Sequence, residues 1–283
     1  MPVQPDIEIF EKRSINQSIE AAFDFLRQNR KVWFRGTLIY LLPYAMVIAL
    51  LWLPNARAES IDTTFSMVFE AFGQSRSLAF LLPGFFLSAL FTVSLLRRGR
   101  EENLSGLTWR QLALLWLPSF VRTLRSAVFL LLAVWVVVLV PFPLQTFLYV
   151  VLIPLWFVLP SHTLADNNLL SAVRLSVKHG FRSWFGLLIM LFFMAFVSFM
   201  LSFAVQLPVA LFFSLSGLVA RMSEAFVQEY LDVVRYVILA LVSYTVFVGA
   251  SFVTLGLCYL YGSAVADYED ENLDGEIDRF ENL

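Results

Sequence analysis

The chain of 283 residues is 59% hydrophobic and only 15% charged, and its mean hydropathy is +0.74. Soluble domains carry about 25% charged residues, so this composition excludes a soluble globular protein and indicates a bilayer protein. The net charge of −2 gives no reason to expect a nucleic-acid partner, and the single cysteine, Cys258, excludes an internal disulfide.

Windows without Asp, Glu, Lys or Arg predict the membrane spans in chain order, since a spanning helix needs about 20 mostly apolar residues. The third window is twice that length and carries Pro141 and Pro143 at its middle, which predicts a hairpin of two short spans. We therefore expect an all-α polytopic membrane protein with about six transmembrane helices and interfacial amphipathic helices, in a single membrane domain of residues 1–266. The predicted spans are 33–54, 77–97, 124–140, 144–160, 184–206 and 236–262, and an acidic tail of residues 267–283 follows them.

The distribution of Lys and Arg predicts the orientation. With both termini in the cytoplasm, only Arg57, Arg76, Arg221 and Arg235 lie outside, which satisfies the positive-inside rule. Residues 1–34 have no signal-peptide pattern, so the first span is expected to direct insertion. We expect a multi-pass protein of the cytoplasmic (inner) membrane with both termini cytoplasmic.

A pattern of 19 residues occurs twice, as residues 16–34 (NQSIEAAFDFLRQNRKVWF) and residues 167–185 (NNLLSAVRLSVKHGFRSWF). An offset of 151 aligns the copies and pairs Trp33 with Trp184. Each copy predicts an amphipathic helix at the membrane surface, directly before an apolar span. A weaker third copy begins at Thr108. We interpret this as a parallel internal repeat; the alternative is that any helix beside a membrane becomes basic and aromatic.

Local capping signals support both helices. Ser14 with Gln17 three residues later is a capping box for the first copy, and Asp166 or Asn167 is the expected cap of the second. The basic and aromatic residues of the copies predict contacts with anionic lipid headgroups or with a cytoplasmic protein partner. These candidate contact residues are Arg174, Lys178, Arg182, Arg27, Arg30, Lys31, Trp33 and Trp184.

Residues suited to catalysis are scattered along the chain. His162 and His179 have no partners at ligand spacing, so we expect no catalytic residues, no cofactor and no metal in the membrane domain. The tail from position 270 matches the calcium loop of an EF-hand, with Gly275 at its turn; the alternative is an acidic tail that is solvated or binds a partner. The calcium ligands would be Asp270, Asn272, Asp274, Glu276, Asp278 and Glu281.

Three stretches carry a resemblance to known proteins: residues 153–160 (IPLWFVLP), 168–176 (NLLSAVRLS) and 184–188 (WFGLL). The pattern is a proline-bearing span, a cytoplasmic helix and a tryptophan that opens the next span. It resembles six-helix bacterial inner-membrane proteins, including uncharacterised families and the membrane domain of some glycerophosphodiester phosphodiesterases. In those phosphodiesterases a separate soluble barrel is catalytic, and nothing in this chain matches its metal-binding residues. The resemblance therefore implies a fold without an activity.

These observations predict a non-catalytic integral membrane protein that acts as a scaffold or as a subunit of a membrane complex. The alternative is a conduit or transporter for a small or lipid-like solute. A cavity at membrane depth lined by polar groups such as Ser198, Ser202, Gln206, Ser243, Thr245 and Ser251 would favour transport, whereas a filled core would favour the scaffold.

Overall fold

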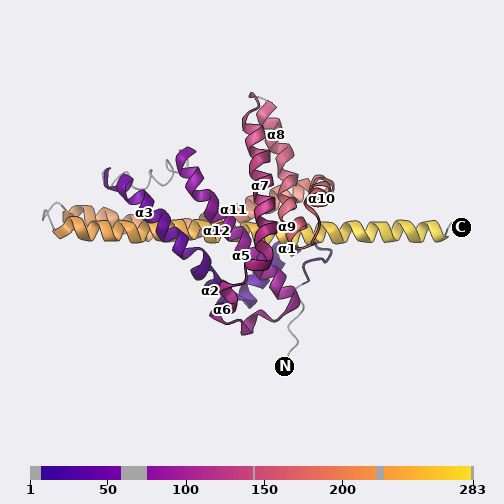
Figure 1. Ribbon diagram of the computed structural model, residues 1–283, viewed down its shortest axis with the longest axis horizontal. Helices are drawn as coiled ribbons and strands as arrows, with labels where there is room; N and C mark the ends of the chain where they lie inside the picture. Colours follow the sequence, from indigo (N-terminus) through magenta and orange to yellow (C-terminus); the bar gives the residue numbers. More distant parts are fainter. Residues whose placement is uncertain (1–7, 59–74, 143, 221–225, 282–283) are drawn as a thin grey trace. The chain divides into compact units, whose positions relative to one another are not determined.

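The computed structural model describes residues 8–58, 75–142, 144–220 and 226–281, and helix is the only regular structure in these ranges (Figure 1). The predicted all-α class is confirmed. The elements are α1 (Ile15–Gln28), α2 (Arg30–Tyr40), α3 (Leu42–Ala58), α5 (Ser75–Glu101), the 3-10 helix η2 (Leu104–Gly106), α6 (Trp109–Ala113), α7 (Leu117–Val138), α8 (Leu144–Leu152), the 3-10 helix η3 (Ile153–Phe157), α9 (Val158–Thr163), α10 (Leu169–Arg182), α11 (Trp184–Ala220) and α12 (Phe226–Glu281).

Five helical segments within these ranges are long and apolar enough to cross a bilayer. The shortest has 21 residues, which at 1.5 Å per residue gives about 31 Å, enough for a hydrocarbon core of about 30 Å. The chain is thus a multi-pass helical membrane protein. The segments are Arg30–Leu51, Leu81–Glu101, Trp109–Val138, Trp184–Val205 and Tyr236–Asp270.

The predicted span over residues 144–160 does not coincide with one of these long segments. It forms a shorter apolar segment, Phe147–Thr163, in which η3 separates α8 from α9. Pro154 lies within η3, where its missing N–H removes a helical hydrogen bond. The predicted hairpin itself is present, because α7 ends at Val138, α8 begins at Leu144 and the two helices pack together.

Two helices extend beyond their predicted spans. The backbone of α11 stays helical to Ala220, and α12 runs from Phe226 to Glu281, through most of the predicted acidic tail. Two stretches between candidate spans, residues 59–74 and 221–225, lie outside the described residues.

The described helices divide into two compact units. Unit 1 contains Met1–Phe34, Ala89–Met194 and Val253–Leu283, and unit 2 contains Arg35–Ser88 and Ala195–Phe252. The interior of unit 1 is rich in aromatic rings. The ring centres of Trp33 and Phe91 are 5.1 Å apart, and the ring centre of Phe25 lies 6.4 Å from those of Trp33 and Tyr259. Tilted and edge-on ring pairs of this kind add stability beyond the area that they bury.

The two copies of the repeated pattern form α1 and α10, each 14 residues long. A single residue separates each from the apolar helix that follows: Asn29 has φ −103° and ψ 19°, and Ser183 has φ −97° and ψ 19°. When these hinges are matched, Asn29 corresponds to Ser183. This is an offset of 154 residues, whereas the sequence alignment uses an offset of 151 residues. Trp33 therefore corresponds in structure to Leu187, because the first helix breaks about one turn earlier relative to its tryptophan.

The N-terminal caps of these helices differ. Ser14 caps α1 as predicted: the backbone N–H of Gln17 donates to Ser14 Oγ (3.3 Å), and the backbone N–H of Ser14 donates to Gln17 Oε1 (2.8 Å). The N-cap of α10 is Asn168, without a side-chain hydrogen bond, so the predicted cap at Asp166 or Asn167 is wrong. The Asp166 carboxylate pairs with Arg97 instead (3.0 Å), and its φ of 56° turns the backbone before the helix.

Candidate lipid and partner interface

Three of the predicted contact residues, Arg174, Lys178 and Arg182, form a basic row on α10. Two of these three residues contact α12. Arg182 Nη2 lies 3.1 Å from Asp267 Oδ2. The Lys178 ammonium lies 3.8 Å from the centre of the Tyr268 ring and also donates to the Tyr268 hydroxyl. Arg174 is exposed and makes no ion pair within the described part of the chain. The row is thus divided between two residues that hold α12 and one that faces outward.

His179 lies on the buried side of the same helix. Its ring packs edge-on against Tyr268 (5.2 Å) and Tyr261 (6.5 Å). Burial, with the positive charges of Lys178 and Arg182 beside it, lowers the pKa of His179 below its usual value. The ring is therefore held neutral and serves as an aromatic packing group.

Asp267 also holds the N-terminal segment, residues 8–14. Lys12 Nζ lies 3.0 Å from Asp267 Oδ1 and 3.6 Å from Asp270 Oδ2. Hydrogen bonding to Asp267 raises the pKa of Lys12, since a nearby carboxylate favours the charged ammonium. One carboxylate on α12 thus connects α10 to the start of the chain.

The backbone of the N-terminal segment packs directly on α12. Arg13 N–H donates to Ser263 Oγ (3.0 Å), and the Ser263 hydroxyl donates to the Arg13 carbonyl (2.7 Å). Ile9 is 1% exposed. A side chain at Gly262 would place its Cβ 2.0 Å from the Ile9 carbonyl oxygen, so only glycine allows this approach. Sequence reasoning missed this contact, because the two segments are about 250 residues apart.

The basic residues of the first copy remain available at the surface. Arg27, Arg30 and Lys31 are exposed and have no ion-pair partner among the described residues. The two tryptophans differ from the prediction and from each other. Trp33 is 7% exposed and packs on aromatic rings, so its ring is not available to lipid. Trp184 is half-buried, and its indole N–H donates to the Val150 carbonyl (3.4 Å).

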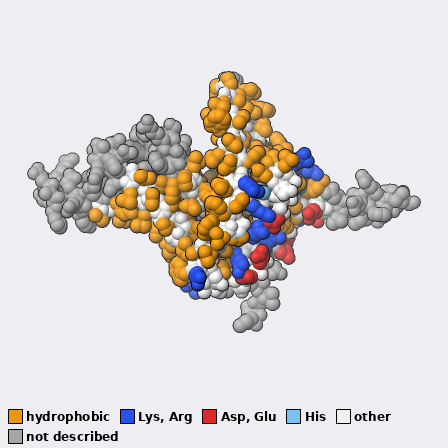
Figure 2. Space-filling model, in the orientation of Figure 1, with side chains coloured by type: hydrophobic (Ala, Val, Ile, Leu, Met, Phe, Trp, Pro, Cys, Tyr) orange, Lys and Arg blue, Asp and Glu red, His pale blue; other side chains and the backbone are white. Residues whose placement is uncertain are grey.

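Sequence reasoning also missed a cluster of arginines around the end of α9. Arg100 Nη1 donates to the Leu164 carbonyl (2.9 Å), and Arg97 Nη1 donates to the Thr163 carbonyl (3.4 Å). Arg122 pairs with Asp166, which Arg97 also contacts. Cations satisfy the free carbonyls at a helix C-terminus, so this cluster fixes the turn that leads into α10. In Figure 2 basic and acidic side chains lie side by side, whereas α7 and α8 expose mainly hydrophobic side chains.

The described residues contain no group of three or more His, Cys, Asp or Glu placed to hold a metal ion. The predicted calcium loop falls in α12, whose backbone is helical from Asp270 to Glu281, while the side chains beyond Asp270 lie outside the described residues. An EF-hand loop turns at its central glycine, so calcium binding would require this part of α12 to unwind. It stays a prediction.

Comparisons with protein-family models, with curated proteins and with solved structures give no match. The resemblance to six-helix bacterial inner-membrane proteins therefore remains an expectation from the sequence.

Proposed function

We propose that the chain is a non-catalytic scaffold or subunit of a membrane complex, with both termini cytoplasmic in the inner membrane. In this proposal the exposed basic residues of α1, α2 and α10 bind a partner protein at the cytoplasmic surface. Anionic lipid headgroups around them would meet the same cations and Trp184.

The proposal rests on the hydrogen bonds that the hydroxyl groups of unit 2 make. The hydroxyl of Ser198 donates to the Gly249 carbonyl (2.9 Å), and those of Thr245 and Ser251 donate to carbonyls three residues earlier, at 2.8 Å and 2.6 Å. Ser202 and Ser243 are buried. The Gln206 side chain lies outside the described ones. The hydroxyls of Ser198, Thr245 and Ser251 thus join helices or bond to their own helix, whereas the buried Ser243 hydroxyl has no hydrogen-bond partner among the described residues. The three bonded hydroxyls support a filled core over a solute path.

The exposed cations supply the second part of the argument. Arg27, Arg30, Lys31 and Arg174 make no ion pair among the described residues, whereas Lys178 and Arg182 bind α12. An unpaired guanidinium at a surface is an effective ligand for carboxylate or phosphate groups, through two parallel hydrogen bonds. The scaffold proposal assigns binding to these four residues and internal stability to the other two.

Purification from native membranes in mild detergent tests the proposal. We expect the wild-type chain to elute with a second protein at fixed stoichiometry, measured by light scattering and mass spectrometry. Replacing Arg27, Arg30, Lys31 and Arg174 by Gln should release that protein without unfolding the chain. The control is Arg110→Gln with Arg125→Gln, which changes exposed arginines on α6 and α7.

Deletion of residues 271–283 separates the role of the tail from that of Asp267. The deletion keeps the contacts of Asp267 with Lys12 and Arg182, so any loss of the second protein would come from the tail itself. A wild-type chain that elutes alone and passes a small solute across reconstituted vesicles would contradict the scaffold and favour the conduit.

A further inference from the structure

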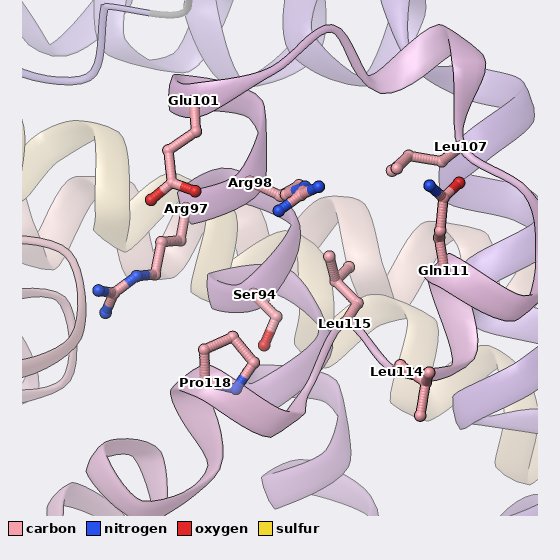
Figure 3. A pocket seen from close by; sticks show the side chains of 9 residues that line it. All are labelled: Ser94, Arg97, Arg98, Glu101, Leu107, Gln111, Leu114, Leu115 and Pro118. Atoms are coloured by element: carbon pink, nitrogen blue, oxygen red, sulfur yellow. The ribbon is translucent and has the colours of Figure 1, made fainter.

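Unit 1 contains a cavity of about 370 Å³ between the C-terminal part of α5 and the segment from η2 to the start of α7 (Figure 3). Ligand pockets in proteins begin at about this size. Apolar side chains and Gln111 from the η2–α7 segment form one side of the cavity, and polar side chains from α5 form the other. The lining residues are Ser94, Arg97, Arg98, Glu101, Leu107, Gln111, Leu114, Leu115 and Pro118.

A buried polar group in the wall points to a ligand. Ser94 is 2% exposed, and its hydroxyl has no hydrogen-bond partner within the described part of the chain. Figure 3 shows this hydroxyl between Pro118 and Leu115. Leaving a buried hydroxyl unpaired is unfavourable, so a ligand atom that accepts its proton would remove an existing penalty.

The charges at the rim have both signs. Arg98 and Glu101 both extend from the C-terminal part of α5 (Figure 3), and Arg98 Nη2 also lies 2.6 Å from Glu102 Oε2. Arg97 lines the cavity, but its guanidinium binds Asp166 (3.0 Å). A purely anionic group would meet Glu101 and Glu102 as well as the arginines. A group with a phosphate and an ammonium would pair with both signs.

The cavity adjoins the ends of two candidate spans, the level at which lipid headgroups are expected. It is between the end of one candidate span, Leu81–Glu101, and the start of the next, Trp109–Val138. Trp109 is 52% exposed, as expected for a tryptophan at the membrane interface. From the cavity an exposed apolar stripe continues along α7 at helical spacing, where an acyl chain would lie. The stripe consists of Leu114, Leu117, Val121, Leu124 and Val128.

We propose that this cavity binds one phospholipid whose headgroup carries a phosphate and a primary ammonium, as in phosphatidylethanolamine. The phosphate pairs with Arg98 and accepts the Ser94 hydroxyl proton, the ammonium pairs with Glu101, and an acyl chain follows the α7 stripe. The site is separate from the exposed cations assigned to the scaffold.

Native mass spectrometry of the purified full-length chain in detergent tests the proposal with phosphatidylethanolamine, phosphatidylglycerol and phosphatidylcholine, each added alone. We expect one phosphatidylethanolamine to bind more tightly than either other lipid. Arg98→Gln should weaken that binding about tenfold, the loss of one charge-assisted hydrogen bond, and Ser94→Ala should weaken it in the same direction. Arg125→Gln, an exposed arginine outside the cavity lining, is the control.

Glu101→Gln examines the ammonium contact separately. It should abolish the preference for phosphatidylethanolamine over phosphatidylglycerol while leaving the phosphate contact in place. Equal binding of all three lipids by the wild type would overturn the proposal. Equal binding of phosphatidylethanolamine by Arg98→Gln, Ser94→Ala and Arg125→Gln would also overturn it.

Discussion

Helices α1 and α10 have the same length and nearly the same hinge, but they are anchored by different chemistry. When the hinges are aligned, the three buried positions of α1 coincide with buried positions of α10: Ser18, Ala22 and Phe25 correspond to Ala172, Ser176 and His179, while α10 buries Gly180 in addition. Phe25 packs on Trp33 and Tyr259, whereas His179 packs on Tyr261 and Tyr268 between two cations. The same helix and hinge geometry thus accommodates, as the buried side chain that anchors the helix, either an apolar residue (Phe25) or a titratable one (His179).

The comparison also shows how surface charge is divided. The cations near the hinge of α1 remain unpaired among the described residues, while Lys178 and Arg182 of α10 bind α12. A duplicated unit would explain the shared hinge and the shared buried register, and we retain the internal repeat as a proposal. Under it, α10 became a structural contact and α1 kept its exposed cations.

Removing the buried Phe25 ring should have the largest effect on the unfolding free energy. Phe25→Ala deletes a ring that is 3% exposed and touches two aromatic neighbours, so we expect a loss of about 3–5 kcal/mol in unfolding free energy. Denaturant unfolding in detergent micelles would measure it. Phe181→Ala removes a ring of α10 that is 50% exposed and serves as the control. Equal losses would show that the buried face of α1 is not an anchor.

Adding a methyl group at Gly180 of α10 should have an intermediate effect on the unfolding free energy. A Cβ at Gly180 would lie 2.7 Å from Pro154 Cβ and 2.8 Å from the Pro154 carbonyl oxygen, a backbone atom that cannot move aside alone. Gly180→Ala should therefore lower the unfolding free energy by about 1–3 kcal/mol. Gly106→Ala, where an added Cβ meets nothing within 4 Å, is the matched control. A stable Gly180→Ala chain would mean that α10 and η3 can separate.

Protonation of His179 should have the smallest effect on stability. Burial lowers the pKa of His179 in the folded chain, so the unfolded chain binds the proton more readily. Stability should then fall as the pH drops below about 6.5, the usual histidine value, and be fully present at neutral pH. Thermal unfolding from pH 8 to pH 5 would detect this slope. His179→Phe, which keeps a ring as in Phe25, should reduce it, and an unchanged slope would assign it to another group.

Features that depend on neighbouring residues could be predicted from the sequence. The capping box at Ser14, the hairpin between Val138 and Leu144 and the basic row on α10 each follow from residues within a few positions of one another. The length of α12 could not be predicted in this way, because the acidic composition of residues 267–283 is compatible with either a coil or a helix. The hinge at Asn29 was missed because no Pro or Gly marks it.

Features that depend on distant residues were not predictable from local patterns. Arg97 and Arg122 both meet Asp166 near the end of α9, a contact that no local pattern specifies. The burial of Trp33 likewise depends on Phe91, which lies on another helix. The cavity near Ser94 requires α5 and α6 to be adjacent, which no spacing in the sequence specifies.

The contact between Lys12 and Asp267 has a consequence for the number of membrane crossings. These residues lie 3.0 Å apart, one before the first candidate span and the other at the end of the last. A chain that returns to the side where it started crosses the bilayer an even number of times, and the described residues contain five long apolar segments. The short segment Phe147–Thr163, a helix broken at Pro154, would supply a further crossing in a locally thinned bilayer.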